Sequence, residues 1–323
     1  MKIEIKIVLF LLFLPPMLGE LVTGSSPPLE FFNPILFIIL VLLYGCGTLL
    51  IREAKARWNL QWSVIFLGVA YGVLEEGTIV QSFFNVSHVD LGALSEYGMF
   101  WGVQWPWTIS LVLLHGTLST LIPIAISELI WPEYKNQPLL KKRGLFFTSV
   151  GLILIVVFWM VVVIGQKTEA MYENYTPDII LVMGSILVLF LLFWLAYKYK
   201  DSRFVFGKCR VFPPLVFGIA GFLFQAVNVL LPNVLAESFV ASSVTVYSQV
   251  FLVVIVLTFI FCQVYNRSVT KRHIVSLIFG SVFFWILISP ITEHNINGAF
   301  GLSFVGIIAL IMLIAFRRRA LKT

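Results

Sequence analysis

Two adjacent carboxylates inside an apolar stretch are the side chains of this sequence best suited to chemistry. The segment "YGVLEEGTIVQSFFN" covers residues 71–85 and places Glu75 and Glu76 near the end of a run typical of a membrane helix. Placing an acid inside a bilayer costs free energy. Such an acid is therefore usually found where it pairs with another group or has a function. Neighbours on an α-helix point about 100° apart, so we expect the two carboxyls to face different surroundings. Either one suits a general base or a proton carrier.

A histidine in the next apolar run is the natural partner for these acids. His115 lies near the middle of "WPWTISLVLLHGTLSTLIPIAISELIW", and Ser119 follows one turn later on the same face. Pro123 is expected to kink this helix and to free a backbone carbonyl nearby. Because consecutive helices usually pack together, the sequence predicts that Glu75 and His115 form an acid–base or metal-binding pair.

Three further polar residues are candidates for support of this pair. Glu20 follows Pro15 and Pro16 at the end of the first apolar run, and Gln225 and Asn228 lie in a later one. Polar groups at such positions are rare inside membranes, which makes each of them a candidate for a role at the site.

Known cofactor motifs are not found in the sequence. It contains no phosphate-binding loop, dinucleotide-binding glycine motif, haem motif or Cys/His zinc spacing. The three cysteines, Cys46, Cys209 and Cys262, show neither metal-ligand spacing nor an obvious disulfide pairing. Spacing therefore predicts no metal site, and the cofactor stays unknown.

The composition predicts whether water or lipid surrounds the protein that carries these residues. The chain has 323 residues, of which 59% are hydrophobic and 12% are charged, with a mean hydropathy of +0.98. A soluble domain is about 45–50% apolar and about 25% charged. Long apolar runs recur over the whole length, and no segment between them is large enough for a soluble domain. We therefore predict one all-α integral membrane domain over residues 1–323, a polytopic transmembrane helix bundle in the cell membrane.

The apolar runs predict about ten membrane spans. They cover residues 5–22, 34–52, 60–82, 104–131, 144–165, 178–198, 211–231, 243–264, 273–290 and 299–316. The first run has the basic start of a signal peptide but no A-x-A cleavage site, and Pro15 and Pro16 interrupt it. We expect it to be retained, whereas cleavage would leave nine spans.

The distribution of basic residues predicts the orientation. With ten spans and the N-terminus inside, every Lys and Arg except Lys167 falls on the inner side. This agreement with the positive-inside rule predicts that both termini are inside. The net charge of +6 then reflects topology and attraction to anionic inner-leaflet lipids, and it does not indicate binding to nucleic acid.

The spacing of the acids and the histidine resembles a known family. Two acids near the end of one membrane helix, with a histidine in the next, are similar to the CAAX protease and bacteriocin-processing family of intramembrane proteases. Its pattern is E-E-x-x-x-R, then F-x-x-x-H, then H-x-x-x-N. Here Glu75, Glu76 and His115 match that pattern. The resemblance implies a glutamate that activates water, with a histidine and an asparagine around the oxyanion.

The sequence departs from that pattern at several positions. Val80 stands at the arginine position, Leu111 at the phenylalanine, and the third motif is missing because Gly298 follows His294 where asparagine is expected. The matching segment covers about 45 of 323 residues. The whole chain also resembles uncharacterised prokaryotic multi-pass membrane proteins with an outer "GSSPP" segment and an "EEG" helix.

Three hypotheses of function remain open. In an intramembrane hydrolase, Glu75 would be the base, Glu76 its partner, and His115 the oxyanion donor or a metal ligand, acting on a membrane-embedded peptide or a lipid-linked substrate. A proton- or cation-coupled transporter would need a polar path to the inner face, for which Glu128 is nearly the only candidate. In a non-catalytic membrane scaffold, Glu75 and His115 would form a structural bridge.

Overall fold

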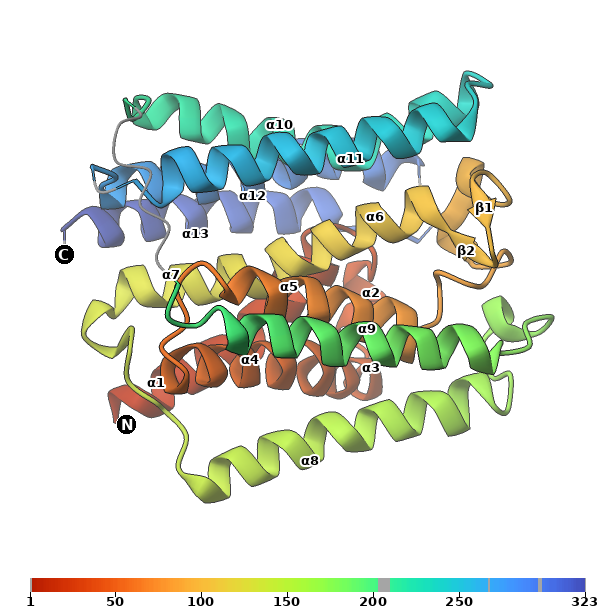
Figure 1. Cartoon of the computed structure of the whole chain (residues 1–323), viewed down its shortest axis with the longest axis horizontal. Coiled ribbons are helices and arrows are strands. Elements are labelled where there is room, and N and C mark those ends of the chain that lie inside the picture. Colours follow the sequence, from red (N-terminus) through yellow and green to blue (C-terminus); the bar gives the residue numbers. More distant parts are fainter. Residues whose placement is uncertain (1, 203–209, 267, 296–297, 323) are drawn as a thin grey trace.

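Long helices that lie side by side make up almost the whole protein. The computed structural model describes residues 2–202, 210–266, 268–295 and 298–322. Both termini lie at one end of the bundle, and a short antiparallel hairpin of β1 (Met99–Phe100) and β2 (Val103–Gln104) lies at the other end (Figure 1). Cys209, Arg203, Lys208 and Arg267, which entered the sequence predictions, lie outside the described residues.

Helices occur at each of the ten predicted ranges. The N-terminal part contains α1 (Ile3–Pro16) with η1 (Met17–Leu21), α2 (Pro28–Phe31), α3 (Pro34–Leu40) with η2 (Val41–Gly45) and α4 (Cys46–Arg57), and α5 (Val64–Gly72) with η3 (Val73–Ile79). The middle part contains η4 (Val89–Leu94), α6 (Trp105–Leu114) with η5 (His115–Leu121) and α7 (Ile122–Ile130), η6 (Pro132–Tyr134), α8 (Lys142–Phe158) with η7 (Trp159–Ile164), η8 (Ala170–Tyr172) and α9 (Ile179–Lys198). The C-terminal part contains α10 (Pro214–Glu237), α11 (Ser242–Phe259) with η9 (Ile260–Val264), α12 (Lys271–Asn295) and α13 (Leu302–Lys322).

Seven of these helices are membrane-span candidates. Judged by length and composition over the described residues, they are Pro34–Arg57, Trp105–Ile130, Lys142–Ile164, Ile179–Lys198, Pro214–Glu237, Ser242–Val264 and Lys271–Asn295. The protein is thus an all-α, multi-pass membrane protein. The count of ten spans stays a prediction.

Two local predictions were wrong. Pro15 and Pro16 do not interrupt the first helix, because α1 includes both and continues without a break into the π-helical segment η1. A proline removes only its own N–H bond, and close packing against a neighbouring helix compensates for the loss. The carbonyl of Leu12, which Pro16 leaves without its helical partner, lies against Gly45 of η2. The predicted span over residues 273–290 ends too early, because α12 continues through His294 to Asn295.

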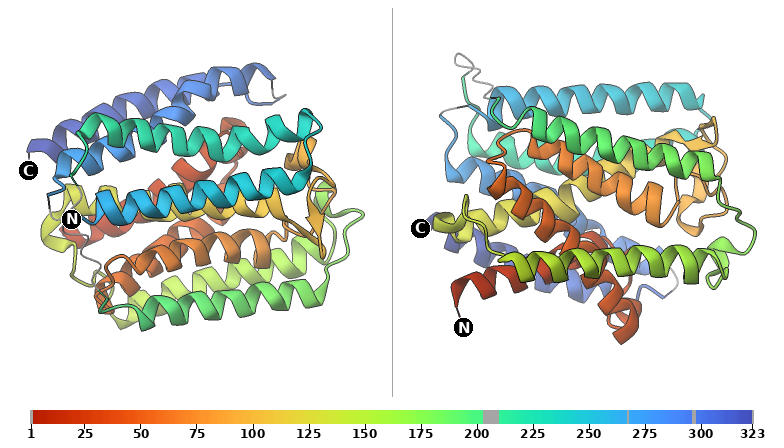
Figure 2. Two further views of the ribbon diagram at one scale, coloured as in Figure 1. Left: turned by 45° about the horizontal axis from the view of Figure 1, so that its top comes forward. Right: turned by 60° about the horizontal axis from the view of Figure 1, so that its bottom comes forward.

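The helix of α6, η5 and α7 runs through the middle of the bundle. On one side it packs against α1, α4 and α5, and on the other side against α10, α11, α12 and α13 (Figures 1 and 2). Two apolar cores result, one on each side of this central helix. Helix α8 packs on α4 and η2 at the edge of the bundle, with most of its surface exposed.

A glycine pair lets α5 approach the central helix closely. A Cβ atom added to Gly116 in η5 would lie 3.1 Å from the carbonyl oxygen of Gly68 in α5, and one added to Gly68 would lie 3.0 Å from the carbonyl of Gly116. Small residues at a contact are the usual means of bringing membrane helices together. This contact places η3 against η5 and so positions the acids beside the histidine.

Candidate functional site

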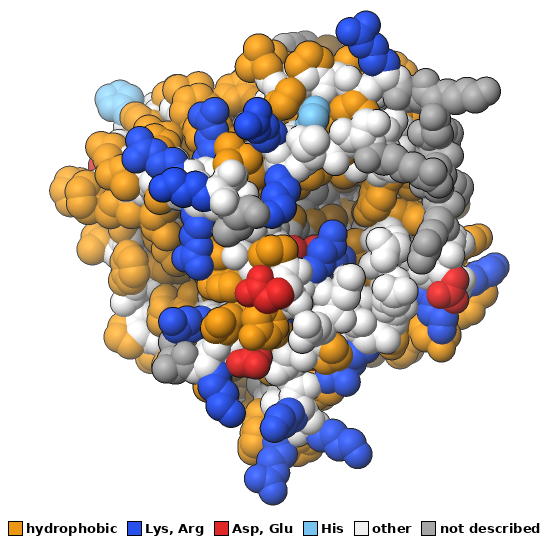
Figure 3. Space-filling model, turned by 90° about the vertical axis from the view of Figure 1, so that its left-hand side faces the viewer, with side chains coloured by type: hydrophobic (Ala, Val, Ile, Leu, Met, Phe, Trp, Pro, Cys, Tyr) orange, Lys and Arg blue, Asp and Glu red, His pale blue; other side chains and the backbone are white. Residues whose placement is uncertain are grey.

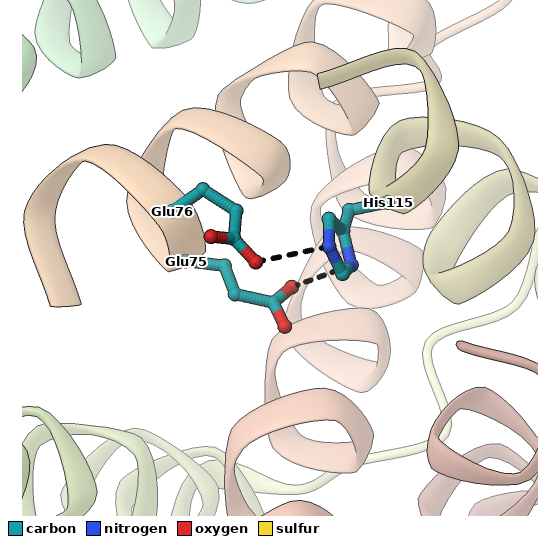
Figure 4. A group of neighbouring side chains, drawn as sticks. All are labelled: Glu75, Glu76 and His115. Atoms are coloured by element: carbon teal, nitrogen blue, oxygen red, sulfur yellow. Dashed lines mark ion pairs between the residues drawn. The ribbon is translucent and has the colours of Figure 1, made fainter. Parts of the chain in front are cut away.

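The imidazole of His115 lies between the carboxyls of Glu75 and Glu76 (Figure 4). Its Nδ1 atom is 3.1 Å from Oε2 of Glu75, and its Nε2 atom is 3.1 Å from Oε1 of Glu76. The three residues are 3%, 1% and 8% exposed, respectively. The structure therefore brings all three predicted residues into one buried cluster.

The expectation that Glu75 and Glu76 face different surroundings was wrong. Both contact the same ring, at its two different nitrogens. The physical reason is local: η3, which carries both acids, is a π-helix, and its wider turn changes the directions of successive side chains.

π-Helical geometry is concentrated at this cluster. Of the six π-helical segments in the described part of the chain, four carry polar residues of the cluster or its surroundings: η1 with Glu20, η2 with Tyr44, η3 with Glu75 and Glu76, and η5 with His115. Such segments are rare and often occur at functional sites. The backbone thus singles out the same region as the side chains.

Ser119 ties His115 to the helix α4. Its hydroxyl lies 3.3 Å from Nδ1 of His115. Its backbone carbonyl accepts a hydrogen bond of 2.6 Å from the hydroxyl of Thr48 in α4. The expectation of a freed carbonyl near Pro123 stays a prediction.

Glu76 is held from its other side. The hydroxyl of Ser82 donates to Oε2 of Glu76, and the indole Nε1 of Trp107 donates to the Ser82 oxygen over 3.1 Å. Ser82 is fully buried. The Glu76 carboxyl is therefore fixed between Ser82 and the imidazole.

Glu20 lies beside the cluster and is held by hydroxyl groups. It accepts hydrogen bonds from Tyr44 and, over 2.6 Å, from Ser26. The ring of Tyr44 lies 5.9 Å from that of His115 and 6.1 Å from that of Tyr71, measured between centroids. Glu20 is thus connected to the cluster through Tyr44, whose ring lies beside that of His115, and its role stays a prediction.

Sequence reasoning missed Tyr44, Tyr71 and Ser82. Tyr71 could have been found, because it lies one turn before Glu75 and so on the same face of that helix. Tyr44 and Ser82 carry no such signal, because only the packing of distant segments brings them to the site.

Gln225 and Asn228 are not part of this cluster. Gln225 accepts a bond from the indole of Trp285 and donates to Thr117, each over 3.3 Å, and Asn228 donates to the carbonyl of Ser110 over 2.9 Å. These bonds join α10 to α12 and to the opposite face of the central helix. Both side chains are fully buried.

The cluster carries an excess of acids. Glu20, Glu75 and Glu76 surround one histidine, and among the described residues no Lys or Arg forms an ion pair with them. The buried Arg52 and the partly buried Lys55 pair instead with Glu53 and Glu128. Excess negative charge in a low-dielectric interior requires protons or a cation for balance.

The donor atoms are also close enough to bind a metal ion. One ligand atom from each of Glu75, Glu76 and His115 lies within 4.8 Å of the other two. Carboxylate oxygens and imidazole nitrogens are ligands of zinc and related ions. Cys46, the buried cysteine of α4, is not part of this group.

The comparisons with known proteins identify a family without naming an activity. No curated protein and no solved structure matches the chain. One family model, described as an uncharacterized membrane protein family, matches residues 9–320, which is nearly the whole chain. The protein therefore belongs to this membrane protein family.

Proposed function

We propose that the protein is an intramembrane hydrolase with its water-activating centre at Glu75, His115 and Glu76. The observation that carries this proposal is the position of the imidazole, with each ring nitrogen 3.1 Å from a different carboxylate. A carboxylate and an imidazole in contact inside a water-poor site are a pair suited to general acid–base catalysis. The four π-helical segments around the centre support a functional role.

Each residue has a role that follows from its contacts. Glu75, whose Oε2 atom lacks a hydrogen-bond partner among the described residues, takes the proton from water. Glu76, held by Ser82, fixes the ring from its other edge. His115 acts as the donor to the developing oxyanion or as a metal ligand. The substrate is a membrane-embedded peptide or a lipid-linked molecule, because the centre lies inside an apolar bundle.

The burial of the centre adds a requirement. All three side chains are closed off from solvent, so a substrate reaches them only after neighbouring helices separate. Such gating steps are common in enzymes with enclosed sites.

The test compares membranes that contain the protein with membranes that contain the Glu75→Gln variant. Peptides and lipids are analysed by mass spectrometry after incubation, with Glu128→Gln as the control for loss of a buried acid elsewhere. We expect cleavage products with the parent and the control only. Identical products with Glu75→Gln and with His115→Ala would overturn the hydrolase and favour the non-catalytic scaffold.

A proton- or cation-coupled transporter is the second candidate, and one observation favours it. Tyr44, Thr48 and Arg52 recur every fourth residue on α3–η2–α4, are all buried, and follow one face from the centre toward the end that carries Lys55 and Glu128. Thr48 bonds to the carbonyl of Ser119. Polar groups therefore continue further toward that end than the sequence indicated.

Transport is tested in proteoliposomes loaded with a pH-sensitive dye. A transporter predicts a proton flux, driven by an imposed membrane potential, that falls in both Glu75→Gln and Thr48→Val. A hydrolase predicts no flux above that of protein-free liposomes.

We also propose ten membrane crossings with both termini inside. Both termini lie at one end of the bundle (Figure 1), and Figure 3 shows Lys and Arg side chains gathered on that end. This end then faces the anionic lipids of the inner leaflet. Single cysteines in place of Ser87 and Asn136, in a chain without native cysteines, test the proposal. A membrane-impermeant thiol reagent applied to intact cells should label position 87 and not position 136.

A further inference from the structure

The Nδ1 edge of His115 has the spacing of a metal site. Nδ1 lies 3.1 Å from Oε2 of Glu75 and 3.3 Å from Oγ of Ser119. Ligands bound at about 2.1 Å around a tetrahedral zinc ion are about 3.4 Å apart. The observed separations are therefore those of atoms that could share one ion with little movement.

Two buried oxygen atoms at this edge have no well-directed hydrogen bond. Among the described residues, Oε2 of Glu75 and the hydroxyl of Tyr71 lack a hydrogen-bond partner, and these residues are 1% and 2% exposed. The Nδ1 atom is near Glu75 Oε2, but its direction does not satisfy that oxygen. Tyr71 lies one turn before Glu75 and so on the same face of that helix. Unsatisfied buried polar atoms are costly, so two at one point indicate a missing ligand.

The surrounding charge favours a cation as that ligand. Glu20, Glu75 and Glu76 face a single histidine, without a Lys or Arg partner among the described residues. A neutral or anionic ligand would leave this excess uncompensated. A divalent cation would offset it and would satisfy the unpaired Glu75 oxygen directly.

We propose that Glu75 and Nδ1 of His115 bind one divalent cation of the zinc class, with Ser119 and Tyr71 beside it. Nε2 keeps its contact with Glu76, because a metal-bound histidine usually gives its second nitrogen to a carboxylate that orients the ring. A mixed nitrogen and oxygen donor set suits Zn²⁺ better than Mg²⁺ or Ca²⁺, which prefer oxygen ligands alone. This inference rests on the proposed site and assigns His115 the role of metal ligand in place of oxyanion donor.

The test titrates Zn²⁺ into the full chain, purified in detergent and treated with a chelator, in the absence of any substrate. We expect one Zn²⁺ per chain and no saturable binding of Mg²⁺. Co²⁺ bound at the same place should give visible absorption bands that Zn²⁺ displaces. Binding should weaken at least 100-fold in Glu75→Gln and in His115→Gln. In Glu76→Gln it should weaken about 10- to 100-fold, as expected for an orienting carboxylate.

Two variants keep the result interpretable if the Glu75 variant fails to fold. Glu128→Gln removes a partly buried acid far along the central helix and should bind Zn²⁺ like the parent. Tyr71→Phe removes only one hydroxyl and should weaken binding several-fold. No saturable Zn²⁺ binding to the parent, or binding that survives Glu75→Gln unchanged, would overturn the inference.

The two proposals fail in different ways. Hydrolysis that continues in chelator-treated protein without Zn²⁺ binding would leave a metal-free hydrolase and would overturn the metal site. Stoichiometric Zn²⁺ binding without any hydrolysis would leave the metal site standing and would overturn the hydrolase.

Discussion

Thr48 donates its hydroxyl to the backbone carbonyl of Ser119 over 2.6 Å. The two residues belong to different helices, α4 and η5, and both are fully buried. The bond therefore joins the helix that carries Tyr44 to the helix that carries His115, one turn from the centre.

Replacement of Thr48 by Val should destabilise the protein by about 1–3 kcal/mol, because the buried Ser119 carbonyl would lose the Thr48 hydroxyl as its donor. Val keeps the shape of Thr and removes only the hydroxyl. Thermal unfolding in detergent measures the effect. Thr148→Val is the control, since Thr148 bonds only to the carbonyl of Gly144 in its own helix. Equal stability of the two variants would show that the bond between the helices contributes little.

Gly116→Ala should separate α5 from the central helix. The added methyl group would lie 3.1 Å from the Gly68 carbonyl, a backbone atom that cannot move aside alone. We expect a loss of about 1–3 kcal/mol, typical of overpacking, together with loss of function. In Gly184→Ala, where an added Cβ meets nothing within 4 Å, helix propensity alone predicts a gain of up to about 1 kcal/mol. The unfolding midpoints of Gly116→Ala and Gly184→Ala are compared, and similar midpoints for both variants would contradict the close contact between Gly116 and Gly68.

We expect Glu53 to stabilise the fold, in contrast to Glu75 and Glu76 of the candidate centre. Its carboxyl accepts bonds from Arg52 over 3.0 Å, from Arg57 over 3.1 and 3.2 Å, and from the backbone N–H of Leu139 over 2.7 Å. Glu53→Gln should cost about 3–5 kcal/mol, because Arg52 would remain buried beside a neutral partner. Glu133→Gln, at an exposed acid nearby, should change stability by less than about 0.5 kcal/mol. Denaturant titrations of the parent, Glu53→Gln and Glu133→Gln measure the free energy of unfolding of each protein.

Glu75→Gln and Glu76→Gln should leave the chelator-treated protein as stable as the parent, or more stable. Each removes one carboxylate from a group that holds more acids than bases, while keeping the side-chain shape. Residues selected for function often reduce stability, and their replacement restores it. Thermal unfolding in detergent tests both variants, singly and together. A loss of several kcal/mol in both would instead identify the acids as a structural bridge.

The helices could be predicted from the sequence, but their contacts could be predicted only in part. Long apolar runs require helices in a membrane, since every backbone group must be bonded internally. The pairing of Glu75 with His115 followed from the rule that consecutive helices pack together. Tyr44 lies at the same site but belongs to a third helix, and the residues next to it in the sequence do not predict this position.

Gln225 and Asn228 show why the rest escaped prediction. In water, an apolar stripe marks the buried face of a helix. In a membrane, the lipid-facing side of a helix is apolar as well, so apolar residues do not mark the packed face. A polar residue within such a helix indicates that it needs a hydrogen-bond partner, but the sequence does not indicate which residue that partner is. These two bond to Ser110, Thr117 and Trp285 across the second core and not to the acids. The contact of Glu75 and Glu76 with the ring of His115 depends on a π-helical turn, which no residue pattern in the sequence predicts.

The π-helical segments have a consequence for changes in the length of the chain. Each holds one residue more than the α-helical turn it replaces. Deletion of a single residue within Val73–Ile79 would convert the wide turn into a regular α-helical one. The flanking helix would keep its register, but the side chains within the turn, those of Glu75 and Glu76 included, would point in new directions relative to His115. The same holds for His115–Leu121. Insertions and deletions that soluble loops accept freely would therefore disassemble this centre even where every one of its side chains was retained.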